Sequence, residues 1–217
     1  MAKKKVSTND ILSSYMNLVL AGKKPDSMYE FATSLGIKES ELYEHYTSFT
    51  SIEKGVFEWF FDHTHELLLK DDQYSGYNAK NKLLSFYFTF FEIMTANRSY
   101  VISVLNSHKN EMESLRSLSL LRIKFKKYVD LLDIDTLDTK RLSLEKIKQE
   151  GLTAIAWSQL LTAIKFWSHD TSPKFEKTDL YIEKSLNASF DLIDIRPLES
   201  LIDLGKFLFK ERGNLTY

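Results

Sequence analysis

Glycine and proline are scarce along this chain, with only 7 and 3 of them among 217 residues. Both residues interrupt regular structure, and folds built from many short strands need them at their turns. Apolar residues recur instead at spacings of three and four, for example at Ile11, Tyr15 and Leu18, which is the period of an amphipathic helix. No segment shows the alternating apolar and polar pattern of a β-strand. The sequence therefore predicts an all-α fold.

The composition supplies a core and excludes some chemistry. Hydrophobic residues make up 43% of the chain, which argues against general disorder. The absence of cysteine excludes disulfides, thiolate metal sites and cysteine nucleophiles. The most apolar stretch, residues 83–94, contains Glu92 and is shorter than the roughly 20 residues of a membrane span. We therefore expect a buried helix there, no stable membrane insertion and a cytoplasmic location.

Capping and stop signals mark the helices near the N-terminus. Thr8 or Asn9 can cap a first helix, and Gly22 ends it. Ser27 can cap a second helix, with a glutamate three residues later at the spacing of a capping box, and Gly36 is a left-handed stop. Further helices are expected at 39–46, 51–69, 79–96, 98–107, 110–133, 152–169, 177–194 and 197–211, with polar connections at 133–143 and 168–179.

Residues 27–52, SMYEFATSLGIKESELYEHYTSFTSI, resemble the helix-turn-helix of TetR-type transcriptional regulators. The matching positions are Ser27, Ala32, Gly36, Ile37, Leu42, Tyr43, His45, Tyr46 and Ile52. The resemblance implies a DNA-binding domain at 1–50 and a helical effector-binding and dimerisation domain at 51–217. It further implies a homodimeric, ligand-responsive repressor that releases DNA when a small molecule enters the second domain.

The segment that would face DNA departs from the family pattern. Where many relatives have Ser-Lys-Gly-Thr, this chain has Lys-Glu-Ser-Glu at 38–41, and Phe49 stands where a phosphate-binding lysine is common. Glu44 adds a further acid. The candidates for contacts with phosphates or bases are Lys38, Ser40, Tyr43, His45 and Thr47.

The charge around this segment leaves the function open between two classes. Residues 23–62 hold 4 lysines and 8 acids, a net charge of −4, whereas nonspecific DNA binding depends on neutralising phosphates. Lys3, Lys4 and Lys5 form either a phosphate-binding arm or a solvated tail. The sequence favours a TetR-like regulator; the alternative is a small-molecule or lipid-binding protein of the same fold that has lost DNA binding.

Aromatic residues in the later helices are candidates for a ligand pocket. Phe86, Phe90, Trp157 and Trp167 are expected to line an apolar cavity for an apolar or amphipathic small molecule, with plain core packing as the alternative. A two-fold dimer is expected through the helices at 152–169 and 177–194. Its candidate residues are Ile155, Trp157, Leu160, Leu161, Ile164, Leu186, Phe190 and Ile193.

Other patterns carry weaker functional signals. His63 and His65 are two residues apart and point to different faces of a helix, whereas a zinc pair prefers a spacing of four. The basic stretch 116–127 is either a solvated face or a surface for anionic lipid. No phosphate loop or nucleophile elbow is present. We therefore expect no metal, no cofactor and no enzymatic activity.

Overall fold

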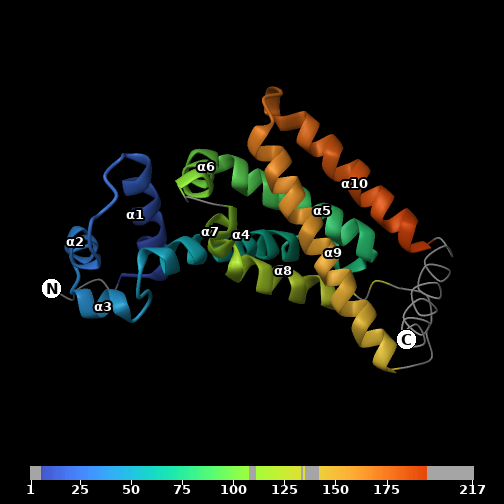
Figure 1. Ribbon diagram of the computed structural model, residues 1–217, viewed down its shortest axis with the longest axis horizontal. Helices are drawn as coiled ribbons and strands as arrows, with labels where there is room; N and C mark the ends of the chain where they lie inside the picture. The colour runs from blue at the N-terminus through green and yellow to red at the C-terminus, as the bar shows by residue number, and fades with distance from the viewer. Residues whose placement is uncertain (1–5, 108–110, 133, 135–141, 195–217) are drawn as a thin grey trace, which may run out of the picture. The chain divides into compact units, whose positions relative to one another are not determined.

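The computed structural model describes residues 6–107, 111–132, 134 and 142–194. Every regular element in this part of the chain is a helix (Figure 1), which confirms the all-α fold class. The chain divides into two compact units, residues 1–76 with 85–128 and residues 77–84 with 129–217. No helix in the described part is long and apolar enough to cross a membrane. The functional boundary expected at residue 50 stays a prediction.

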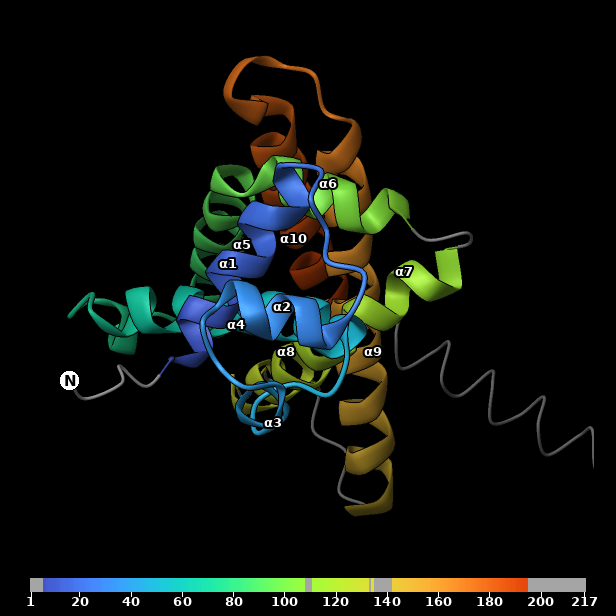
Figure 2. The same cartoon turned by 90° about the vertical axis from the view of Figure 1, so that its left-hand side faces the viewer.

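Four helices open the first unit, and three of them lie together at its N-terminal end (Figure 2). Their bounds are α1 Thr8–Leu20, α2 Met28–Ser34, α3 Glu39–Tyr43 and α4 Phe49–Leu69. The short helices α2 and α3 pack against each other, and α1 packs against α4. This is the helix-turn-helix arrangement that the sequence predicts.

The caps of α1 and α2 differ in part from the prediction. Ser7, not Thr8 or Asn9, caps α1, because its hydroxyl accepts from the Asp10 amide while the Asp10 carboxylate accepts from the Ser7 amide. Ser27 caps α2 as predicted. The expected capping box is incomplete, since the Glu30 carboxylate accepts from the Asp26 amide at 2.8 Å instead.

The turn between α2 and α3 has the geometry that its residues predict. Gly36 has a φ of 69°, a left-handed conformation that glycine adopts without a steric penalty. Ala32 is almost fully buried, which is consistent with close approach of two helices, and Leu42 is fully buried as the inward anchor of α3. Behind them, the Tyr15 ring meets Phe31 edge-on at 5.8 Å.

The rest of the first unit is a helical body with an aromatic core. Its elements are the 3-10 helix η1 Tyr74–Gly76, α5 Ala79–Ala96 from residue 85, α6 Arg98–Ser107, α7 Glu111–Ser117 and α8 Ser119–Leu131 up to residue 128. The single helix expected at 110–133 is wrong, because α7 ends before α8 begins at Ser119. Leu118 between them is buried, and its carbonyl accepts from the Arg122 amide at 2.8 Å as the start of α8.

A hairpin of two long helices dominates the second unit. The 3-10 helix η2 Pro173–Phe175 joins α9 Leu142–His169 to α10 Glu176–Asp194 (Figure 1). The expected start of α9 at residue 152 is wrong by ten residues, because the preceding stretch is rich in good helix formers and Gly151 does not interrupt it. The helix expected at 177–194 is confirmed within one residue. The expected helix at 197–211 lies outside the described residues.

Candidate functional site

The helix that would face DNA is short and acidic. Helix α3 ends at Tyr43, with Glu44 as its C-cap, so the expected continuation of α3 to residue 46 is wrong. Lys38 stands at the N-cap without a side-chain hydrogen bond, and Glu39 and Glu41 occupy the first turn. A negative charge there stabilises the helix through its dipole, although the same charge opposes an approaching phosphate.

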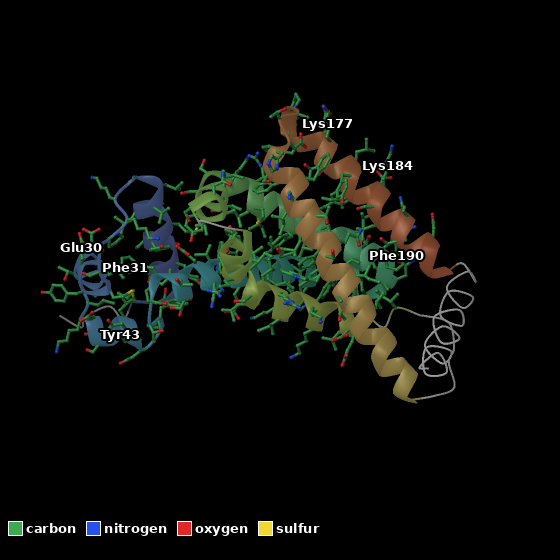
Figure 3. All side chains as sticks on the ribbon, in the orientation of Figure 1. Glu30, Phe31, Tyr43, Lys177, Lys184 and Phe190 are labelled. Carbon is green, nitrogen blue, oxygen red and sulfur yellow. The ribbon has the colours of Figure 1, made fainter. Side chains whose placement is uncertain are left out.

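The residues predicted to contact DNA lie together in space on α3 and the segment after it. Lys38, Ser40, Tyr43 and Thr47 are exposed, and His45 is half-buried. Tyr43, labelled in Figure 3, is 45% exposed. Its hydroxyl donates to the Glu39 carboxylate at 2.8 Å, and this hydrogen bond raises the pKa of Tyr43. The tip of Tyr43 is therefore held by an acid of its own helix.

His45 connects this segment to the first residue of α1. Its Nδ1 lies 3.1 Å from the Thr8 hydroxyl, so the chain enters α1 beside the segment that follows α3. The lysines at 3–5 precede this point by three residues or more, outside the described part of the chain. Thr8 thus lies beside His45, one of the residues predicted to contact DNA.

A buried carboxylate fixes the base of this region. Glu53 on α4 is only 4% exposed. It accepts from the Tyr15 hydroxyl at 2.8 Å and from the Lys24 ammonium at 3.2 Å. Lys24 also lies over the rings of Tyr15 and Phe49, with its nitrogen 5.9 Å from each centroid. Glu53 therefore joins α4 to Tyr15 and Lys24 inside the fold, and no local pattern in the sequence indicates this because these partners are 38 and 29 residues away.

Two further acids of the region pair with a lysine from a distant helix. The Lys124 ammonium of α8 lies 2.8 Å from both carboxylate oxygens of Asp62 and 3.3 Å from Glu58 on α4. Burial is the largest single influence and lowers the pKa of Lys124, but the hydrogen bonds and charges of Asp62 and Glu58 together outweigh it and leave the pKa raised. Glu58 and Asp62 are therefore paired with a lysine from outside residues 23–62, so the net charge of that segment alone overstates the acidity around them.

The predicted ligand residues fall into two groups. Phe86 and Phe90 are fully buried in the first unit, and their rings stack at 5.5 Å. Trp157 and Trp167 belong to the second unit and are 8% and 0% exposed. Phe86 also contacts Tyr128 at 4.9 Å. A cavity lined by all four predicted residues stays a prediction.

The aromatic cluster carries one buried polar pair that the sequence did not indicate. The hydroxyls of Tyr74 and Tyr128 lie 2.7 Å apart. Burial, together with this hydrogen bond, raises the pKa of Tyr128 far above its usual value. Both side chains stay neutral, so the cluster presents hydroxyl groups without a formal charge.

The two histidines considered for a metal site have separate environments. The His63 ring stacks on Trp59 at 5.2 Å, and the His65 ring stacks on Phe61 at 6.2 Å. The distance from His63 Nδ1 to Glu66 is 4.0 Å. Across the described residues, no group of three or more histidine, aspartate or glutamate side chains is placed to hold a metal ion.

Comparison with protein families gives a match over the later helices. The family model described as tetracyclin repressor-like, C-terminal domain, matches residues 82–208, which is more than half of the chain. This match begins after the helix-turn-helix and is therefore independent of residues 27–52. No curated protein matches the chain.

Proposed function

The chain belongs to the TetR family, and from this premise we propose that it is a dimeric, ligand-responsive transcriptional repressor that acts in the cytoplasm. The main support for the proposal is the order of two parts of the chain. A helix-turn-helix with a left-handed Gly36 and a buried Leu42 precedes a tetracycline-repressor-like C-terminal domain. A small molecule bound in the later helices would shift the population between a DNA-binding and a released state.

DNA binding by this surface must depend on sequence-specific contacts. Glu39 and Glu41 lie in the first turn of α3, and each acid near a phosphate costs about 1 kcal/mol at moderate salt. Each good base contact contributes about 1–3 kcal/mol. A few such contacts therefore offset the repulsion at an operator, whereas DNA of another sequence does not offer these contacts and is repelled. The Tyr43 hydroxyl must give up its hydrogen bond to Glu39 and form one to DNA before it contributes to the binding affinity.

The dimer is proposed to form through α9 and α10, on fewer residues than the sequence suggested. Trp157, Leu160, Ile164 and Leu186 are buried within their own chain and are therefore not available to a partner. Ile155 is 64% exposed, and Leu161 and Phe190 are half-buried. The side chain of Ile193 lies outside the described ones. Ile155→Glu is expected to halve the mass that light scattering measures at micromolar concentration.

The inducer is proposed to be an apolar or amphipathic small molecule. Phe86, Phe90, Trp157 and Trp167 remain its proposed contacts, because large aromatic side chains line such sites in helical proteins. The support is compositional: these are large, buried aromatic side chains of the matched domain. A ligand that raises the melting temperature and weakens operator binding in the same titration would support this assignment.

A binding titration with fragments of the surrounding genome, at low and at physiological salt, tests the regulator. We expect nanomolar affinity for one fragment, and a loss of about tenfold or more when Lys38 or Tyr43 becomes alanine. Lys184→Ala is the matched control, because Lys184 is an exposed residue of α10 (Figure 3) that this proposal keeps away from DNA. Equal losses in Lys38→Ala and Lys184→Ala would contradict the assignment.

The second candidate is a ligand- or lipid-binding protein of the same fold that does not bind DNA. The acidic first turn of α3 favours it. Changing Glu39, Glu41 and Glu44 together to glutamine distinguishes the two candidates, because a glutamine at 39 still accepts the Tyr43 hydrogen bond. If the native chain binds no fragment at low salt and the triple variant gains salt-sensitive, nonspecific binding, the second candidate is supported and the repressor is not.

A further inference from the structure

A hollow of about 400 Å³ lies where α9 ends and α10 begins, within the second unit. Its walls include Thr162, Lys165, Phe166 and His169 from α9, Asp170 after α9, and Lys177 from α10. Figure 3 labels Lys177 near the tip of the hairpin. The volume lies near the lower end of the range for small-molecule sites, so a ligand here would be small.

The charges around the hollow are mostly positive. Lys165 and Lys177 are exposed lining residues, and His169 lies between them along the chain. The His169 Nδ1 lies 2.8 Å from the Lys165 carbonyl oxygen. Because a carbonyl only accepts, Nδ1 donates in this contact, and Nε2 of the neutral ring is an acceptor, which does not bind an anion.

Asp170 is the only acidic residue that lines the hollow, and its carboxylate is already engaged. One oxygen accepts from the Ser172 amide and hydroxyl at 2.8 and 2.7 Å. The other accepts from the Thr178 amide and hydroxyl at 2.9 and 2.7 Å. These four donors compensate the negative charge of Asp170, and the other charged residues that line the hollow are Lys165 and Lys177.

One wall of the hollow is a flat aromatic surface. Phe166 is 39% exposed, and its ring stacks on Tyr181 of α10 with centroids 4.7 Å apart and planes 10° from parallel. The stacking holds the Phe166 ring in place, so the ring loses little side-chain freedom when a ligand covers it. An exposed aromatic face beside cationic groups favours a ligand with both an apolar and an anionic part.

The connection between the two helices is rigid. Beyond the Asp170 bonds, Lys174 and Phe175 adopt left-handed backbone conformations with φ of 53° and 60°, and the Phe175 ring lies 6.4 Å from Trp167. Non-glycine residues keep such conformations only where their surroundings fix them. A fixed connection places Lys177 relative to Lys165 before any ligand arrives, which lowers the entropic cost of binding.

We propose that this hollow binds a small organic anion, a carboxylate with a short apolar or aromatic body. The carboxylate lies between Lys165 and Lys177, and the body lies on Phe166. The site is separate from the proposed inducer contacts, none of which lines it. It is also separate from the proposed dimer contact at Ile155, which precedes Phe166 on α9 by 11 residues, or about 16 Å of helix.

Ligand-observed fluorine NMR on the full chain tests this proposal with 4-fluorobenzoate as the probe and 4-fluorobenzamide as its neutral match. We expect 4-fluorobenzoate to bind with a dissociation constant below about 1 mM and the amide to bind about tenfold or more weakly. Changing Lys165 and Lys177 together to methionine keeps the aliphatic stems and should weaken the benzoate about tenfold. The matched control, Lys184→Met on the same hairpin, should leave its affinity unchanged.

Three results would overturn the proposal. They are equal affinity for the acid and the amide, unchanged affinity in the double lysine variant with unchanged circular dichroism, and no binding of the acid at 5 mM, about five times the expected limit. Inorganic phosphate provides the last comparison, because it carries charge without an apolar body. If phosphate displaces 4-fluorobenzoate at equal concentration, the lysines bind anions generally and the role of Phe166 is wrong.

Discussion

The Tyr15 hydroxyl on α1 donates a 2.8 Å hydrogen bond to the Glu53 carboxylate on α4, and both side chains are buried. Burial, followed by the charge and the hydrogen bond of Glu53, raises the pKa of Tyr15 far above its usual value. The Tyr100 ring of α6 meets Tyr15 edge-on at 6.5 Å, and burial and Glu53 raise the pKa of Tyr100 as well. One carboxylate on α4 therefore influences side chains from two other helices, α1 and α6, and α1 is the first helix of the helix-turn-helix.

Replacing Glu53 with alanine is expected to lower the free energy of unfolding by about 3 kcal/mol, because the variant leaves the buried Tyr15 hydroxyl without its acceptor and opens a cavity. Lys24 is half-exposed and recovers hydration, which limits the loss. Tyr15→Phe removes one hydrogen bond and no packing, so it should cost about 1 kcal/mol. Urea denaturation measures both; a Tyr15→Phe loss as large as that of Glu53→Ala would contradict this ranking.

Lys124 offers a test of partly exposed ion pairs between α4 and α8. Its contacts with Asp62 and Glu58 involve side chains that are 33–44% exposed, so Lys124→Met should cost only about 1 kcal/mol in low salt. In 1 M NaCl the difference from the native chain should shrink to a few tenths of that, because salt screens the pairs. Lys127→Met, an exposed position on the same helix, is the control and should have little effect at either salt concentration.

Asp170 predicts how the stability of the second unit depends on acid. Burial alone would raise the pKa of Asp170, but the hydrogen bonds from Ser172 and Thr178 outweigh it and lower the pKa to about 2. A folded-state value below the unfolded value near 3.9 stabilises the fold above that pH. The contribution is lost as the pH falls from about 4 towards 2. The free energies of unfolding that urea denaturation gives for the native chain and for Asp170→Asn should differ by about 1–2 kcal/mol at pH 6, after discounting for solvent screening, and converge near pH 2.

Local signals in the sequence predicted the helix-turn-helix well. Ser27 and Gly36 act through hydrogen bonds and backbone conformations within a few residues, so their roles follow from their immediate neighbours. The prediction of the α1 cap was wrong because Ser7, Thr8, Asn9 and Asp10 are all residue types that cap helices, and only the folded chain shows that Ser7 does so. The break at Leu118 carries neither glycine nor proline, so no local signal marked it.

The contacts that the sequence did not predict are between residues far apart in the chain. The burial of Glu53 and the pairing of Lys124 with Asp62 depend on residues 29 to 62 positions apart, and charge counting along the chain treats all of them as surface charge. The hollow near Phe166 combines residues from α9, the connection and α10. In the sequence nothing links Lys165 with Lys177, because only the folded hairpin brings them to the same hollow as Phe166.

Gly55 and Tyr46 provide a test of packing beneath the segment that follows α3. A Cβ atom added at Gly55 on α4 would lie 2.5 Å from the Tyr46 hydroxyl oxygen and 2.7 Å from Cε1 of its ring, which is too close for any contact. Gly55→Ala gains about 1 kcal/mol of helix propensity but forces the Tyr46 ring to move, which costs about 1–3 kcal/mol. We therefore expect a net loss of about 1 kcal/mol in the native background.

The sign should reverse when the obstacle is removed. In a Tyr46→Ala background, the added methyl group at position 55 no longer meets the ring, so Gly55→Ala should stabilise the chain by up to about 1 kcal/mol. Gly151→Ala is the control, because a Cβ atom there meets nothing within 4 Å on α9, and it should stabilise the chain in both backgrounds. Urea denaturation of the four combinations at positions 46 and 55 gives the coupling, about 2 kcal/mol if Tyr46 lies on Gly55 as described. The same effect of Gly55→Ala in both backgrounds would show that Tyr46 does not pack there and that the segment after α3 is held in another way.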